Sequence, residues 1–172
     1  MGIENYQGNV LWLTISGGKL VNKKKEISAN AYTGFLKKIE LRTDDYEGQE
    51  VEKVLLTLKD KDETAKVQFT FESWYSIGFF ERITNVDITK AVTIGAMPSD
   101  QNEKMSFCWM KQGETKIVKT DMVKPENTLI GKRQIKDWTK FIEAAHKIIS
   151  DINSKIDFVS SETKDEQEQL PF

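Results

Sequence analysis

The feature that most constrains this chain is a period-two alternation of apolar and polar residues between residues 8 and 120. Such alternation is typical of β-strands that bury one face and expose the other. Turn-forming residues interrupt the pattern, and the segments between them are 10–15, 19–28, 35–42, 53–59, 67–71, 91–97, 104–111 and 115–120. Seven or eight short strands at this spacing indicate a small β-barrel or a β-sandwich.

A different period interrupts the strands over residues 72–85. Ser73 precedes a segment in which apolar residues recur every three positions: Trp74, Ile77, Phe80 and Ile83. This predicts a short helix capped by the Ser73 hydroxyl. A helix between the third and fourth main strands, plugging one end of a small barrel, is the arrangement of an OB-fold. We therefore expect its apolar side chains to be buried rather than to contact a ligand.

The clearest helix in the sequence covers residues 133–156. Its apolar residues are alternately three and four positions apart: Ile135, Trp138, Ile142, Ala145, Ile149, Ile152 and Ile156. Phe141 and Ile148 widen this stripe, which favours packing against the barrel over a narrow coiled-coil seam. A coiled-coil homodimer remains the second interpretation.

Together these segments predict one domain over residues 1–158, a size that supports a hydrophobic core. The predicted fold is mainly β. It is an OB-fold-like antiparallel barrel of about five or more strands, with a short capping helix and a long C-terminal helix.

The chain ends on an acidic segment with an apolar tip. Residues 160–169 contain no apolar residue, and Leu170, Pro171 and Phe172 follow them. A segment this polar cannot bury enough surface to fold alone, so we expect a disordered acidic tail over 159–172. An acidic segment with a hydrophobic end suits capture by a partner pocket surrounded by Arg and Lys.

Composition indicates a soluble cytoplasmic protein. The chain is 38% hydrophobic and 30% charged, and no apolar run approaches the roughly 20 residues of a membrane-spanning helix. The first residues show no basic-then-apolar signal segment. The single cysteine, Cys108, allows no internal disulfide and fits a reducing compartment.

The net charge of −2 conceals an uneven distribution of charge along the chain. Lysines concentrate in residues 19–38 and 104–136, whereas acids concentrate in 40–52 and in the tail. The domain can therefore present a positive face although its summed charge is near zero. Ordinary solvated strands are the alternative explanation for the same lysines.

Signals of catalysis are weak in this sequence. His146 is the only histidine, and Cys108 has no nearby cluster of His or acids that would lower its pKa. One His and one Cys would leave metal binding to carboxylates alone. Gly17, Gly18 and Lys19 form a hairpin pattern rather than a phosphate-binding loop. We therefore expect no catalytic activity, no metal and no cofactor.

Signals for binding an unpaired nucleic-acid strand are stronger. If Leu13 and its apolar neighbours face the core, Trp12 faces solvent, where a large exposed ring indicates a binding role. Aromatic rings stack bases, each worth about 1–3 kcal/mol, while interleaved lysines contact phosphates. The candidate stacking residues are Trp12, Tyr32, Phe35, Phe107 and Trp109, and the candidate phosphate contacts are Lys23, Lys24, Lys25, Lys37, Lys111 and Lys116. Core packing is the alternative for each of the phenylalanines.

The predicted barrel and the final eight residues, Asp165-Glu166-Gln167-Glu168-Gln169-Leu170-Pro171-Phe172, resemble single-stranded DNA-binding proteins of bacteria and their phages. In that family the acidic tip recruits replication and repair enzymes, and the tail can fold back over the DNA cleft. The resemblance implies binding of single-stranded DNA in replication, recombination and repair, in the bacterial cytoplasm or a phage-infected cell. It also implies docking on a polymerase, helicase or primase through Asp165, Glu166, Glu168, Leu170, Pro171 and Phe172.

Three departures from the bacterial pattern favour a phage-type version. Gln167 and Gln169 interrupt the acidic run, a long Gly/Pro/Gln-rich linker is missing, and the helix over 133–156 has no counterpart. A monomer and a homodimer both remain open. A second hypothesis is a non-catalytic β-sandwich that serves in protein interaction or structure, and a third is an RNA chaperone of the cold-shock type.

Overall fold

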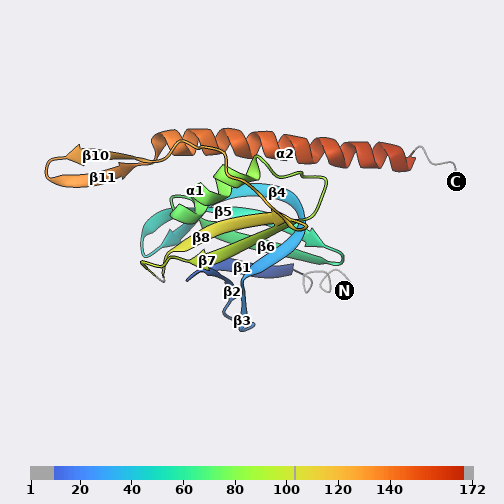
Figure 1. The fold of residues 1–172 in the computed structure, drawn as a ribbon, viewed down its shortest axis with the longest axis horizontal. Helices are drawn as coiled ribbons and strands as arrows, with labels where there is room; N and C mark the ends of the chain where they lie inside the picture. The colour runs from blue at the N-terminus through green and yellow to red at the C-terminus, as the bar shows by residue number, and fades with distance from the viewer. Residues whose placement is uncertain (1–9, 103, 169–172) are drawn as a thin grey trace.

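The computed structural model describes residues 10–102 and 104–168, with the side chains from 162 onward left aside. Strands dominate these residues, together with two helices (Figure 1). The elements follow one another as β1 (Val10–Ser16), β2 (Lys19–Asn22), β3 (Ile27–Ala29), β4 (Ala31–Tyr46), β5 (Gln49–Asp60), β6 (Glu63–Thr70), α1 (Trp74–Ile83), β7 (Val92–Pro98), β8 (Ser106–Gln112), β9 (Thr115–Lys116), β10 (Glu126–Ile130), β11 (Arg133–Asp137) and α2 (Thr139–Glu168).

Nine of these strands form one mixed sheet in the order β3-β2-β1-β6-β5-β4-β7-β8-β9. All neighbours are antiparallel except β1 and β6, which run parallel with Trp12 opposite Lys66. The expectation of an antiparallel barrel therefore needs correction: over the described ranges the sheet is open and mixed. The sheet is mixed because β1 pairs in parallel with β6, which lies far from it in the sequence. Alternation of residues within a strand does not reveal which strand it pairs with.

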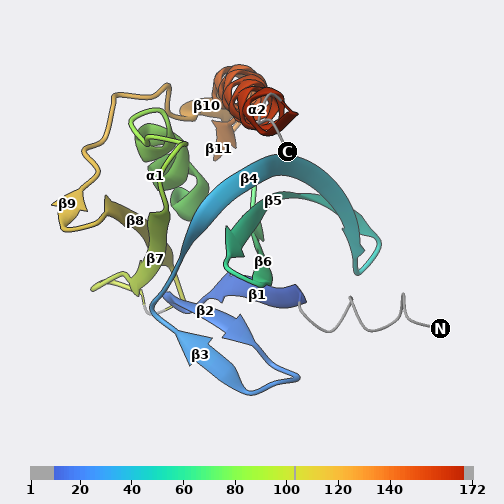
Figure 2. The ribbon, with the colours of Figure 1, turned by 90° about the vertical axis from the view of Figure 1, so that its right-hand side faces the viewer.

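Strand β4 determines the curvature of the sheet because its two parts have different neighbours. Residues 31–34 pair with β7, whereas the strand from Phe35 onward pairs with β5. The register with β5 shifts between Leu36 and Lys38, and such a bulge bends a strand. Figure 2 shows β4 as a continuous arc over β5 and β6.

Helix α1 confirms the short helix expected over 72–85. The Ser73 hydroxyl accepts a hydrogen bond from the Ser76 amide at 3.2 Å, which caps the first turn. Ile77, Phe80 and Ile83 are buried as expected. The first residue of the helix differs, because the Trp74 side chain is 42% exposed.

Helix α2 begins at Thr139 rather than at Arg133. Residues 133–137 form β11 instead, which pairs with β10 across a turn whose first residue, Gly131, has φ 66°. The Asp137 carboxylate then accepts hydrogen bonds from the amide and hydroxyl of Thr139, at 3.0 and 2.6 Å, which marks the helix start. Ile135 thus leaves the apolar stripe and is 46% exposed on the hairpin.

The remaining stripe of α2 packs on the domain as predicted. Its buried members are Phe141, Ala145, Ile149, Ile152 and Ile156. The ring centroid of Phe141 lies 5.9 Å from those of Phe71 and Phe80, so α1, α2 and the residue that follows β6 share one aromatic cluster. The helix continues through residues 159–168, the first part of the segment in which the sequence predicts disorder. Neither helix of the described chain is long and apolar enough to cross a membrane.

Asn153 joins α2 to the open edge of β4. Its side-chain oxygen accepts a hydrogen bond from the Ile39 amide at 2.9 Å, and its nitrogen donates to the Ile39 carbonyl at 2.8 Å. β7 pairs only with residues 31–34, so at Ile39 this edge of β4 has no strand partner among the described residues. The asparagine therefore pairs with the strand backbone as a neighbouring strand would.

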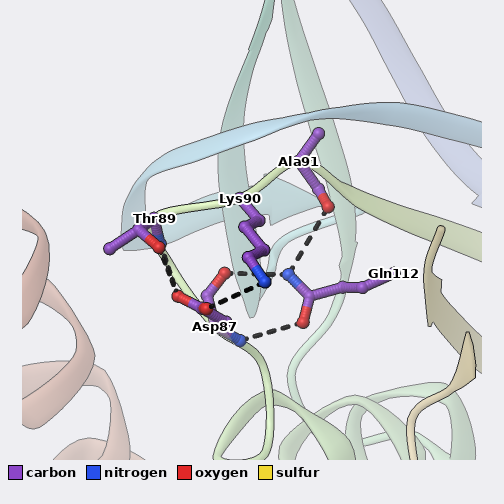
Figure 3. A network of polar contacts seen from close by, with 5 residues as sticks. All are labelled: Asp87, Thr89, Lys90, Ala91 and Gln112. Carbon is purple, nitrogen blue, oxygen red and sulfur yellow. Dashed lines mark hydrogen bonds and ion pairs between the residues drawn. The ribbon is translucent and has the colours of Figure 1, made fainter.

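The connection from α1 to β7 is fastened to the end of β8 by Gln112 (Figure 3). Its side chain accepts from the Asp87 amide at 3.0 Å and donates to the carbonyls of Asp87 and Ala91, at 2.8 and 3.4 Å. The amide and hydroxyl of Thr89 donate to the Asp87 carboxylate, which lowers the pKa of that group. These contacts fix the position of α1 relative to β8.

We predict that Asn153→Ala lowers the free energy of unfolding by about 2 kcal/mol, because it leaves the buried amide and carbonyl of Ile39 without partners. Urea unfolding followed by circular dichroism measures the change. Ser154→Ala alters the exposed next residue of the same helix and serves as the control, with an expected change below about 0.5 kcal/mol. Equal stability of both variants would show that α2 is held by its apolar face alone.

Candidate nucleic-acid interface

The outer face of β1 and β6 carries the most exposed tryptophan of the sheet. Leu13 is 2% exposed and Trp12 is 44% exposed, which confirms the orientation predicted for this strand. Lys66 lies opposite Trp12 on β6, with its Nζ atom 5.9 Å from the centroid of the indole ring. Next along the same face, Gln68 donates a hydrogen bond to the Thr14 hydroxyl at 3.0 Å.

The turn between β2 and β3 brings a run of lysines to this tryptophan. Lys23, Lys24 and Lys25 are exposed there. Asn22 ties the turn to β1, because its side chain donates to the Trp12 carbonyl at 2.8 Å and accepts from the Lys25 amide at 3.1 Å. One asparagine thus connects the lysine turn to the strand that carries the aromatic ring.

These residues line an open groove of about 590 Å³, called here the Trp12 groove. Its lining residues are Val10, Trp12, Thr14, Ser16, Val21, Asn22, Lys23, Lys24, Lys25, Lys53 and Gln68. Four lysines and no acid are among them, so the groove attracts anions. Of the predicted site residues it unites Trp12 with Lys23, Lys24 and Lys25.

Lys53 and Gln68 are among the lining residues that sequence reasoning missed as site residues. Both lie on the outer face of the sheet, on β5 and β6, where Lys53 pairs with Thr70 and Gln68 with Thr14. The alternation of each strand shows that these side chains point outward. Their proximity to Trp12 follows only from the parallel pairing of β1 with β6.

Three predicted residues on β4 lie outside the Trp12 groove. Phe35 is 42% exposed, and the Nζ atom of Lys37 lies 5.7 Å from the centroid of its ring. The hydroxyl of Tyr32 donates to the carboxylate of Glu63 at 2.9 Å, and its half-buried ring packs against the core. Burial and this hydrogen bond raise the pKa of Tyr32. Tyr32 is thus a packing residue in this structure.

Trp109 on β8 packs within the sheet. Its ring lies across Gly95 of β7, where an added Cβ would be 2.1 Å from the indole Cε2 atom. The indole nitrogen donates to the Ala96 carbonyl at 3.3 Å. The half-buried ring therefore occupies the space that a side chain at position 95 would fill.

The other predicted residues of this region also lie outside the Trp12 groove. Lys111 and Lys116 face each other in the hairpin of β8 and β9. Phe107 is half-buried and lines a separate hollow beside α1. The groove therefore gathers only part of the predicted set.

Residues with catalytic potential do not form a reactive group in the described chain. Burial raises the pKa of the Cys108 thiol to about 12, so the thiol stays protonated at neutral pH. His146 is exposed, with its ring centroid 6.0 Å from that of Phe71. No group of three or more His, Cys, Asp or Glu side chains that could hold a metal ion occurs among the residues described.

The predicted partner-docking residues fall largely outside the description. Asp165, Glu166 and Glu168 lie in the last turns of α2, where only the backbone is described. Leu170, Pro171 and Phe172 lie outside the described residues.

Comparisons of the chain with protein-family models, with curated proteins and with solved structures find no match. The resemblance to single-stranded DNA-binding proteins therefore rests on the C-terminal residues and the order of elements.

Proposed function

We propose that this protein binds and protects single-stranded DNA without strong sequence preference, and that it has no catalytic activity. The observation that carries the proposal is the exposed Trp12 ring in a groove whose described lining residues include four lysines and no acid. An unpaired strand presents flat base faces and one negative charge per nucleotide, and this groove offers a partner to both. A duplex hides its base faces in stacking and is a poorer match.

The order of the strands supports an OB-like barrel as the scaffold. β4, β5 and β6 pair in succession, and β7 returns after α1 to lie beside β4, so the order β7-β4-β5-β6 is that of a Greek key. β8 adds to β7 as a fifth strand. The OB-fold is a partly open Greek-key barrel of this kind, in which the face of the second and third strands binds oligonucleotides. Here those strands are β5 and β6, which contribute Lys53 and Gln68 to the Trp12 groove.

The groove favours binding that tolerates any sequence. Stacking on Trp12 requires only a flat base, and lysine ammonium groups contact phosphates that every nucleotide carries. Side chains able to read base edges are few, because Gln68 and Thr14 hydrogen bond to each other and Asn22 bonds to the backbone. Affinity then comes from stacking and charge, and it decreases as salt rises.

We also propose a role for the C-terminal tail in recruiting partners. Its acids, among them Asp165, Glu166 and Glu168, carry the charge pattern of a short strand and compete for the lysines of the groove. Leu170, Pro171 and Phe172 dock on a polymerase, helicase or primase. This part of the proposal is supported by the sequence resemblance, as is action in replication, recombination and repair in the bacterial cytoplasm or a phage-infected cell.

A protein-interaction or structural role is the second candidate function, and one observation favours it. All residues of the hairpin β10–β11 are exposed, including Leu129 at 70% and Ile130 at 62%. The hairpin extends beyond the sheet at the end of α2 where the helix begins (Figure 1). Exposed apolar residues on an extended hairpin are a feature of protein contact surfaces.

We predict that oligo-dT quenches the intrinsic tryptophan fluorescence of the wild-type protein. Trp12→Ala should remove most of the quenching and weaken binding about tenfold, because it removes one stacking surface. Fluorescence anisotropy of labelled oligo-dT measures the affinity, and oligo-U tests the preference for DNA. Phe158→Ala removes an aromatic residue that is 64% exposed outside the groove and should leave affinity unchanged. Absence of oligonucleotide binding by the wild type would favour the interaction role.

The lysine turn generates a separate prediction about salt. Changing Lys23, Lys24 and Lys25 together to Gln should reduce the slope of log affinity against log salt by about 2, since each phosphate contact to a single strand contributes about 0.7. The control changes three exposed lysines that do not line the groove: Lys90, Lys147 and Lys155. An equal loss of slope in both variants would mean that net charge, rather than the groove, controls binding.

For the tail, we predict that deleting residues 160–172 raises affinity for short oligonucleotides and abolishes recruitment of a polymerase or helicase. The triple variant Asp165→Asn, Glu166→Gln and Glu168→Gln should raise affinity while keeping the apolar tip. Pull-down of replication enzymes and anisotropy titrations measure the two effects. Unchanged affinity and unchanged recruitment after deletion would contradict this role.

A further inference from the structure

Two further hollows continue the Trp12 groove across the domain. The first, of about 290 Å³, lies between the end of β1, the start of α1 and the start of β8. It shares Ser16 with the Trp12 groove and is called here the connecting hollow. The second, of about 260 Å³, lies between α1 and β8 and shares Trp74 with the connecting hollow. It is called here the Trp74 hollow. Each of the three hollows shares a lining residue with the next, and together they are called here the track.

The Trp74 hollow offers large exposed apolar side chains at its opening. Trp74 is 42% exposed at the first position of α1, and Met97 of β7 is 49% exposed. Phe107, one of the stacking residues predicted from the sequence, is half-buried in the same lining. The far end of the track thus repeats the type of surface that Trp12 provides.

The charge of this end of the track is positive. Arg82, Lys119 and Lys124 line the Trp74 hollow, and Lys104 lines the connecting hollow. Among the described residues of the two linings, Glu81 is the one acid. It is 8% exposed, and its Oε2 atom lies 3.7 Å from Nη1 of Arg82. The Glu81 charge is therefore largely offset by Arg82, and Lys104, Lys119 and Lys124 are the other cations of the two linings.

Hydrogen bonds fix these cations beside α1. The amide of Thr120 donates to the Glu81 carbonyl at 2.6 Å. Asn85, just after the helix, donates to the Val118 carbonyl at 2.8 Å and to the Thr120 hydroxyl at 2.7 Å. The segment that carries Lys119 is thus held against α1 on both sides of the lysine.

Lys136 of β11 adds a further cation at the tryptophan itself. Its Nζ atom lies 4.3 Å from the centroid of the Trp74 ring, although the residue is otherwise exposed. A cation over an exposed aromatic ring contributes less than a stacked base does. An incoming base can therefore replace the ammonium group on the ring, which leaves Lys136 free to contact the adjacent phosphate.

We propose that the Trp74 hollow is a second stacking site for the same DNA strand. This inference rests on the proposed function of the Trp12 groove. A strand that stacks one base on Trp12 continues past Ser16 and Lys104, and it stacks a later base on Trp74 with Lys119, Lys124 and Lys136 at its phosphates. Short oligonucleotides then occupy only one part of the track, whereas longer ones span both tryptophans.

Oligo-dT of two lengths, about 6 and about 16 nucleotides, tests this proposal, because these lengths cover the range of site sizes for one OB domain. Trp74→Ala should lower the affinity for the longer oligonucleotide about tenfold and change the affinity for the shorter one by less than about twofold. Trp12→Ala should lower the affinity for both oligonucleotides. Phe158→Ala, at an exposed aromatic residue outside the track, should change neither.

The outcomes separate the two proposals. If the wild type binds neither oligonucleotide, the proposed function fails. If the wild type binds both and Trp74→Ala retains full affinity for the longer one, the second site is rejected while the function stands. If the Trp74→Ala variant does not fold, the double variant Lys119→Gln and Lys124→Gln tests the second site instead. Its salt slope should fall by about 1.4 for the longer oligonucleotide alone, and an unchanged slope would overturn the proposal.

Discussion

The divided pairing of β4 is the constraint on which the rest of the structure depends. The strand pairs with β7 over four residues and then with β5, so a bulge bends it and one edge is left open at Ile39. Asn153 satisfies the backbone at that edge and thereby fixes α2. The aromatic cluster of Phe71, Phe80 and Phe141 then fixes α1 between the sheet and α2. Trp74 occupies its position because α1 is held in this way.

Two tryptophans on outward-facing strand positions differ in exposure, and the residues opposite them on the paired strands differ as well. Trp109 faces Gly95, which has no side chain, so the indole lies flat on β7 and is half-buried. Trp12 lies opposite Lys66, whose Nζ atom is 5.9 Å from the centroid of the ring, and the ring is 44% exposed. Alternation along one strand predicts which way a ring points, but its cross-strand neighbour determines whether the ring is free to bind.

The same distinction shows how much the sequence could predict. Local features were within its reach: the orientation of Trp12, the Ser73 cap and the buried stripe of α2 from Phe141 to Ile156 all follow from spacing along the chain. The parallel pairing of β1 with β6 cannot be predicted in this way, because it joins residues more than fifty positions apart. The sequence predicts a helix over residues 133–137 because Ile135 fits the spacing of the apolar stripe. A positive φ at Gly131 and the capping of Thr139 by Asp137 make that segment a strand instead.

The extent of α2 also bears on how the acidic tail can compete with DNA. Residues 165–168 are helical, so their acids cannot fold back on the Trp12 groove of the same chain while the helix persists. Among the α2 residues up to Ser161, whose side chains the structure describes, Ile156 is the last buried one, and Phe158 is 64% exposed. A helical segment of about ten residues is marginal in water on its own. Unwinding of this end therefore costs little, and the lysines of the groove can offset that cost by attracting the released acids. The proposed competition through the tail is then an equilibrium between the helical end of α2 and an extended acidic strand in the groove.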